Sequence, residues 1–200
     1  MNTDDTNKGA TMGMWLFLFS EIMLFGGLFI IYANYYYEYT DGFITGAAEL
    51  STFFGTMNTA VLLVSSFTVA ASVAAVHHGL RKRALALLSM SILLGIAFLV
   101  NKYFEWDHKF AADIYPGSDR LMKGPHGELI FFGLYFTLTG LHALHVIIGL
   151  VVLTFCLVKV GRAKDEALVV QGLFVHNSGL YWHLVDIIWI FLFPLLYLIL

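Results

Sequence analysis

Residues 139–150, TGLHALHVIIGL, place two histidines in the middle of a long apolar run. His142 and His145 are three residues apart, so a helix would bring both to one face. The apolar run around them, residues 129–158, is long enough as a helix to cross a hydrocarbon layer of about 30 Å. The sequence therefore predicts a transmembrane helix with buried imidazoles, and other parts of the chain must supply their hydrogen-bond partners.

Outward from this helix, the composition is that of a membrane protein. Hydrophobic residues make up 59% of the 200-residue chain and charged residues 12%, whereas about a quarter of a soluble domain is charged. No segment alternates as a barrel strand would, and lipid cannot satisfy an open backbone. We therefore predict an all-α membrane protein, a five-transmembrane-helix bundle that forms a single membrane domain over residues 1–200. Its spans cover approximately residues 12–35, 53–76, 84–103, 129–158 and 173–199.

The charge balance and the cysteine content exclude several classes of protein. The net charge is −3, and no basic run indicates binding to nucleic acid. Cys156 is the single cysteine and lies in an apolar run, so a disulfide within the chain is impossible and a thiol nucleophile is not expected. The polar, acid-containing start predicts a short tail and not a cleaved signal. Nothing in the sequence predicts a catalytic centre of its own.

Lysine and arginine predict the orientation, because cytoplasmic loops are enriched in both. An odd number of spans puts the two ends of the chain on opposite sides of the membrane. One side holds seven positive residues, namely Lys8, Arg81, Lys82, Arg83, Lys159, Arg162 and Lys164. The other side holds four, namely Lys102, Lys109, Arg120 and Lys123. We therefore expect a cytoplasmic N-terminus and a periplasmic C-terminus.

Glu21 is an acidic residue inside the first span. No basic residue lies three or four positions away on the same helix. An unpaired carboxyl in this setting is expected to be uncharged, because burial disfavours the ionised form. Two interpretations follow: a buried, protonated hydrogen-bond donor, or a site that faces a partner subunit or a proton path.

Asp186 and His183 share a face of the last span, three residues apart. If the fourth and fifth spans are antiparallel, this pair lies at a depth similar to that of His142 and His145. We therefore expect one hydrogen-bonded cluster between the two helices. Packing contacts between helices are the first interpretation. A proton-handling role and ligation of haem or a metal are the alternatives.

Glu105 and His108 spell Glu-x-x-His, which is half of the ligand pattern of di-iron carboxylate bundles. The chain has one such sequence, and a site needs two with further glutamates, so we expect no metal there. Lys102 and Glu105 are expected to pair instead, at the outer interface. The second span carries small polar side chains suited to helix contact, namely Asn58, Thr59, Ser65, Ser66, Thr68 and Ser72.

Six stretches in order carry a resemblance to a known family. They are MWLFLFSEIMLF (14–25), MNTAVLLVSS (57–66), VHHGLRKR (76–83), LGIAFLVNKYFEW (94–106), TGLHALHVIIGL (139–150) and YWHLVDIIWIFLF (181–193). Together they resemble subunit III of the haem–copper terminal oxidases, the cytochrome c oxidase subunit III family, in its short five-helix form. The long form has two further N-terminal helices, and its glutamate before the last helix is replaced here by His176.

The resemblance implies a subunit without redox centres in a proton-pumping oxidase of a bacterial inner (plasma) membrane. It implies subunit I as the catalytic partner, which carries the haem and copper, with subunit II, a further small subunit and membrane phospholipid as other neighbours. The electron donor it implies is cytochrome c, with quinol as the alternative. An independent membrane metalloprotein, with His142, His145 and His183 as ligands, and a proton channel that uses Glu21 are rival hypotheses.

The resemblance also implies roles for individual residues. Glu21 matches the family's buried glutamate in its Ser-Glu motif. Glu105 matches a glutamate at the end of the family's third-from-last helix. The remaining candidates match the family's intramembrane polar positions, namely His142, His145, His183 and Asp186. All six are therefore candidates for polar contacts within the membrane or with another subunit, and none is expected to be catalytic or to bind a metal or cofactor.

Overall fold

The computed structural model describes residues 3–163 and 172–199, which contain helices and no strand. The helices are α1 (Thr3–Glu38), α2 (Thr40–Ala48), α3 (Thr52–His77), α4 (Arg81–Ala111), α5 (Asp119–Lys123), α6 (His126–Arg162) and α7 (Gly172–Tyr197). Five of these, α1, α3, α4, α6 and α7, are long and apolar enough to cross a membrane. The predicted all-α fold and its five spans are therefore confirmed.

The helices run further than the apolar stretches that predicted them. α4 continues to Ala111 and α6 begins at His126, through residues that are charged or polar. A helix satisfies its own backbone hydrogen bonds, so it can continue past the hydrocarbon layer. The connections also contain two short helices, α2 and α5, which the periodicity of the sequence did not predict.

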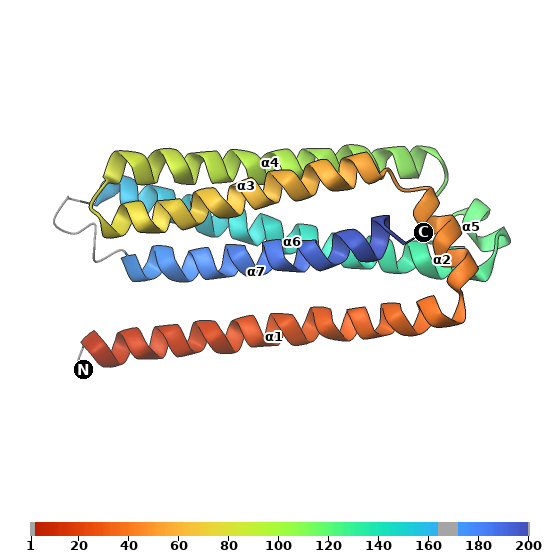
Figure 1. Ribbon diagram of the computed structural model, residues 1–200, viewed down its shortest axis with the longest axis horizontal. Helices are drawn as coiled ribbons and strands as arrows, with labels where there is room; N and C mark the ends of the chain where they lie inside the picture. The colour runs from red at the N-terminus through yellow and green to blue at the C-terminus, as the bar shows by residue number, and fades with distance from the viewer. Residues whose placement is uncertain (1–2, 164–171, 200) are drawn as a thin grey trace.

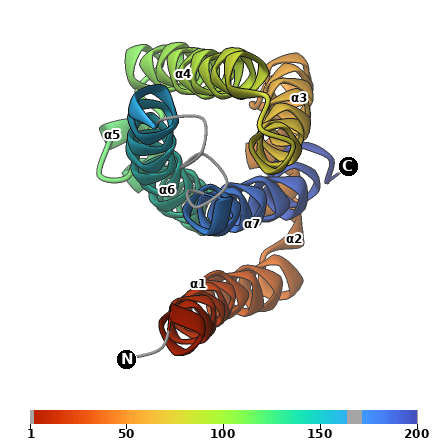
Figure 2. The same cartoon turned by 90° about the vertical axis from the view of Figure 1, so that its left-hand side faces the viewer.

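Helices α3, α4, α6 and α7 surround one core, and α1 lies beside them (Figure 2). The apolar segment of α1 is 11% buried, whereas that of α7 is 56% buried. Large apolar side chains cover the outer side of α1, among them Trp15, Phe19 and Ile30. In a chain that spans a membrane, such a surface faces lipid or another subunit.

The small polar side chains of α3 contact α7 and α4, as the sequence predicts. Ser65 accepts a hydrogen bond from the indole of Trp182 at 3.1 Å, and Thr59 accepts one from Trp189 at 3.0 Å. Ser65 in turn donates to the carbonyl oxygen of Ser91 at 3.2 Å. These bonds satisfy polar groups that lipid could not satisfy, and they fix how α7 is rotated against its neighbours.

Helices approach each other closely at several glycines, which have no side chain to separate them. A Cβ atom on Gly149 would lie 2.7 Å from the ring of Trp182, and one on Gly95 would lie 2.8 Å from the same ring. A Cβ atom on Gly42 of α2 would lie 2.7 Å from the backbone of Gly127 in α6. These glycines therefore allow α4, α6 and α7 to close around Trp182 and allow α2 to pack against the start of α6.

The two termini lie at opposite ends of the bundle (Figure 1). The connection between α3 and α4 and the end of α6 lie at the end that holds the N-terminus. Their basic residues therefore gather at that end, as the loop pattern predicts. Lys164, which belongs to the same set, lies outside the described residues. The orientation of this end towards the cytoplasm stays a prediction.

Candidate functional site

Glu21 of α1 is paired with His145 of α6. The Glu21 Oε2 atom lies 2.8 Å from Nε2 of His145, and the two side chains are 14% and 9% exposed. The expectation that Glu21 is unpaired is therefore wrong. Spacing within one helix could not identify this partner, because His145 lies on another helix, 124 residues further along the chain.

The other ring nitrogen fixes the protonation of this contact. Nδ1 of His145 lies 2.7 Å from the carbonyl oxygen of Leu141. A carbonyl oxygen can only accept, so Nδ1 carries a proton. The Glu21–His145 contact then holds one further proton, which belongs either to the carboxyl or to Nε2. The pair is thus hydrogen-bonded as a neutral acid and imidazole, or as a carboxylate and imidazolium.

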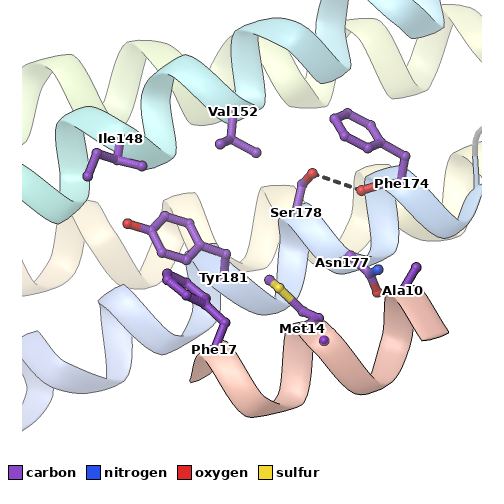
Figure 3. Close-up of a pocket in the computed structure, with 10 residues that line it drawn as sticks. Ala10, Met14, Phe17, Ile148, Val152, Phe174, Asn177, Ser178 and Tyr181 are labelled. Carbon is purple, nitrogen blue, oxygen red and sulfur yellow. Dashed lines mark hydrogen bonds between the residues drawn. The ribbon is translucent and has the colours of Figure 1, made fainter. Parts of the chain in front are cut away.

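A cavity of about 440 Å³ lies between α1, α6 and α7 (Figure 3). Its walls are mostly apolar, with Met14 and Phe17 on α1 and Val152 on α6. Tyr181 of α7 also lines it, and the Tyr181 hydroxyl donates a hydrogen bond to the carbonyl oxygen of His145 at 3.1 Å. Through Tyr181, the cavity therefore lies next to His145, the residue that binds Glu21, and between α1 and its neighbours α6 and α7.

A second polar group lies inside the bundle, around Lys102 and Glu105 of α4. The Nζ and Oε1 atoms are 3.2 Å apart, and each side chain is 3% exposed. Nζ also donates to the hydroxyls of Tyr135 and Tyr197 at 3.1 and 2.7 Å. Both hydroxyls donate to the same Glu105 oxygen, at 2.6 and 2.5 Å. The predicted ion pair is confirmed, but it is enclosed within the protein and joins α4, α6 and α7.

Sequence reasoning missed the two tyrosines of this network. Tyr135 lies seven residues before His142, so it shares the buried face of α6, and this spacing could have identified it. Tyr197 comes from the far end of α7 and has no comparable signal in the sequence. The contact of either tyrosine with Lys102 depends on how α4, α6 and α7 are rotated about their axes, which the sequence does not give.

The expected cluster of His142, His145, His183 and Asp186 is not formed. His145 binds Glu21, and Nδ1 of His183 lies 2.7 Å from the hydroxyl of Ser66 in α3. Neither ring nitrogen of His142 and neither carboxyl oxygen of Asp186 has a hydrogen-bond partner among the described residues. Residues three apart on a helix are separated by about 60° around its axis. That rotation is enough for His142 and His145 to face different neighbours.

His142 is fully buried between aromatic rings. Its ring centroid lies 5.5 Å from that of Phe98 and 5.1 Å from that of Trp189. Among the described residues, no group of three or more histidine, cysteine, aspartate or glutamate side chains is placed to hold a metal ion. In the Glu-x-x-His sequence, Glu105 is buried and His108 is exposed, so the two do not face one site.

Comparison with known proteins agrees with this architecture. The model of the family described as cytochrome c oxidase subunit III matches residues 1–199. Cytochrome c oxidase subunit 3 of Xenopus laevis is 33% identical over 202 residues, which is 98% of this chain and 72% of that protein. Cytochrome bo(3) ubiquinol oxidase subunit 3 of Pseudomonas aeruginosa is 29% identical over 97% of this chain and 87% of its own length.

A third relative is a longer protein, the heme-copper oxidase subunit I+III of Aeropyrum pernix. It is 34% identical over 93% of this chain, and the match covers 22% of its length. The family model, the two subunit 3 relatives and this fused protein all match nearly the whole chain. The chain therefore belongs to the cytochrome c oxidase subunit III family, the subunits III of haem–copper oxidases.

Proposed function

We propose that this chain is a non-catalytic subunit III that supports aerobic electron transport and proton pumping by packing against the catalytic subunit. The observation that carries this proposal is the family match over residues 1–199. Several described polar residues also fit a packing role, because their bonds join helices, as in Glu21–His145 and Lys102–Tyr197. Haem and copper would then lie in the partner, and the chemistry they supply there is the reduction of dioxygen.

Subunit I is the expected neighbour. The Aeropyrum pernix relative is named as subunits I and III in one protein, which supports a direct association of the two. The exposed apolar side of α1 offers surface for such contacts within the membrane. Subunit II and a further small subunit complete the proposed complex. We propose phospholipid as the occupant of the mostly apolar cavity between α1, α6 and α7.

Cytochrome c is the proposed electron donor, and quinol is the alternative. The relatives include a cytochrome c oxidase subunit and a ubiquinol oxidase subunit at comparable identity. The donor binds another subunit, so this chain does not select between them. Oxygen consumption by the purified complex decides the question, with reduced cytochrome c and a quinol supplied separately. We further propose a bacterial inner membrane, with the N-terminus in the cytoplasm.

Native purification through a tag on this chain tests the proposal. We expect a haem-containing complex to co-purify, with the haem absorbance following subunit I when the subunits are separated. Stoichiometric haem or iron on this chain alone would support the metalloprotein hypothesis and overturn the proposal. Proton flux into liposomes that contain this chain alone would instead support the channel hypothesis.

A further inference from the structure

A second groove lies on the outer side of the bundle, between α4 and α6. Its volume is about 420 Å³, and it shares no lining residue with the cavity of Figure 3. Exposed aliphatic side chains line it, such as Ile96 of α4 and Val151 of α6. Thr154 also lines it, but its hydroxyl donates to the carbonyl oxygen of Leu150 in its own helix at 2.7 Å. The groove therefore offers an occupant mainly apolar contact.

The length of the groove fits one leaflet of a bilayer. On α6 it extends from Ile147 to Val158, which is about 16 Å along the helix axis. Arg162 lies one turn further, about 6 Å beyond the groove. The stretch from Ile147 to Arg162 is therefore about 22 Å long, half of the about 40–45 Å that a bilayer measures with its headgroups.

Two arginines lie at this end of the groove. Arg81 comes eleven residues before Ile92, which is about three helical turns, so it lies on the face of α4 that lines the groove. Arg162 comes four residues after Val158, on the corresponding face of α6. The Arg81 guanidinium donates to the carbonyl oxygen of Gly161, which holds it against the end of α6. Neither arginine forms an ion pair with a carboxylate of residues 3–163 or 172–199.

These arginines suit a phosphate group. A guanidinium has five N–H donors, so the bond to Gly161 leaves four on Arg81. Arginine binds phosphate through two parallel hydrogen bonds, and cations at a membrane surface attract anionic lipids. A helix of another subunit could fill the groove, but it would leave both arginines without an anion. A free phosphate would leave the apolar groove empty.

We propose that the groove between α4 and α6 binds an anionic phospholipid of the leaflet at the basic end of the bundle. Its phosphate lies between Arg81 and Arg162, and an acyl chain lies along the groove. The site requires only that the chain spans a membrane, so it does not rest on the proposed packing against subunit I.

Photocrosslinking in the intact complex that co-purifies with this chain tests the site. The probe is a phosphatidylglycerol with a photoreactive group on one acyl chain, and mass spectrometry identifies the labelled residues. We expect labels on both walls of the groove, at residues such as Ile96 and Val151. Unlabelled phosphatidylglycerol should compete for the groove better than phosphatidylcholine, which carries no net charge.

Variants of the two arginines measure the contribution of charge. One cation near the membrane surface contributes about 1 kcal/mol, a factor of about five in affinity. Arg162→Gln should therefore weaken binding of the probe about fivefold, and the double variant Arg81→Gln, Arg162→Gln about 30-fold. The single variant keeps the bond between Arg81 and Gly161, so its loss of affinity does not come from a changed contact between α4 and α6.

Arg83→Gln is the matched control. Arg83 is exposed and lies nine residues before Ile92, which is two and a half turns, so it is on the opposite face of α4. This variant removes the same charge and should bind the probe like the wild type. Val151→Trp keeps both arginines but fills the groove, and it should remove the labels from the groove.

Two results would overturn the site. Equal affinity of the wild type and Arg162→Gln for the probe would show that lipid in the groove is not held by its phosphate. Labels elsewhere on the chain but on neither wall of the groove would show that a protein segment covers it.

Discussion

The carboxyl of Glu21 on α1 and the imidazole of His145 on α6 lie 2.8 Å apart and share one proton. The contact links the most exposed long helix to the four that surround the core. Helix α1 is also attached by ring contacts, such as Phe25 with His145, and by the hydrogen bond from the Tyr32 hydroxyl to the carbonyl of Leu195. The Glu21–His145 pair is therefore a polar attachment point of α1.

Glu21→Gln should leave assembly and the initial rate of oxygen reduction nearly unchanged. The glutamine amide can donate to Nε2 of a neutral His145, so the link between α1 and α6 is kept. Glu21→Leu leaves that ring nitrogen without its partner and should destabilise the complex by about 1–3 kcal/mol. The measurements are oxygen consumption and the thermal melting of the purified complex. Immediate loss of all activity in Glu21→Gln would contradict this role.

Lys102→Met should destabilise the protein more than any change at Glu21. It leaves the Glu105 carboxylate enclosed without its cation, and breaking a buried ion pair costs about 3–5 kcal/mol. The double variant Lys102→Met, Glu105→Gln removes both charges and should recover part of the loss. Tyr135→Phe removes the hydrogen bond to Glu105 and the one from Lys102, both with charged groups, and should cost about 1.5–3 kcal/mol.

Thermal melting of the complex, with retention of this chain on a sizing column, compares these variants at the Lys102 network. The single variant Glu105→Gln completes the set. If the loss of stability in the double variant equals the sum of the losses in the two single variants, the two charges do not interact.

Features that depend on one helix at a time were predictable from the sequence. The five spans follow from apolar length, and the Lys102–Glu105 pair follows from a three-residue spacing. The contact surface of α3 follows from its small polar side chains, such as Ser65. Each of these patterns is local, so it is complete within the segment that shows it.

Features that depend on how helices are rotated against each other were not predictable in the same way. His145 turns towards Glu21 on α1 and His183 turns towards Ser66 on α3, so the cluster expected between them and Asp186 does not form. Apolar faces are broad in a membrane protein, because lipid and protein are similarly apolar. Hydrophobic periodicity therefore does not identify which neighbour a polar residue meets.

Gly149→Ala should destabilise the protein and Gly133→Ala should not, although both glycines lie in α6. A methyl group on Gly149 would lie 2.7 Å from the ring of Trp182, and that ring is held by its bond to Ser65. Overpacking of this kind typically costs about 1–3 kcal/mol. A methyl group on Gly133 meets nothing within 4 Å. Alanine there should be neutral or stabilise the helix by up to about 1 kcal/mol.

Melting temperatures of the two single variants in the purified complex give this comparison. Equal destabilisation by both would mean that Trp182 does not pack against Gly149 as the structure shows.

Labelling of single cysteines should show that the end with Lys82 faces the cytoplasm and the end with Asp119 the periplasm. Both side chains are exposed, and Cys156, the native thiol, is buried. In a Cys156→Ala background, a maleimide that cannot cross the membrane should label Asp119→Cys in intact spheroplasts. Lys82→Cys should react only after the membrane is opened. The reverse pattern would overturn the orientation, because the basic loop between α3 and α4 would then be outside.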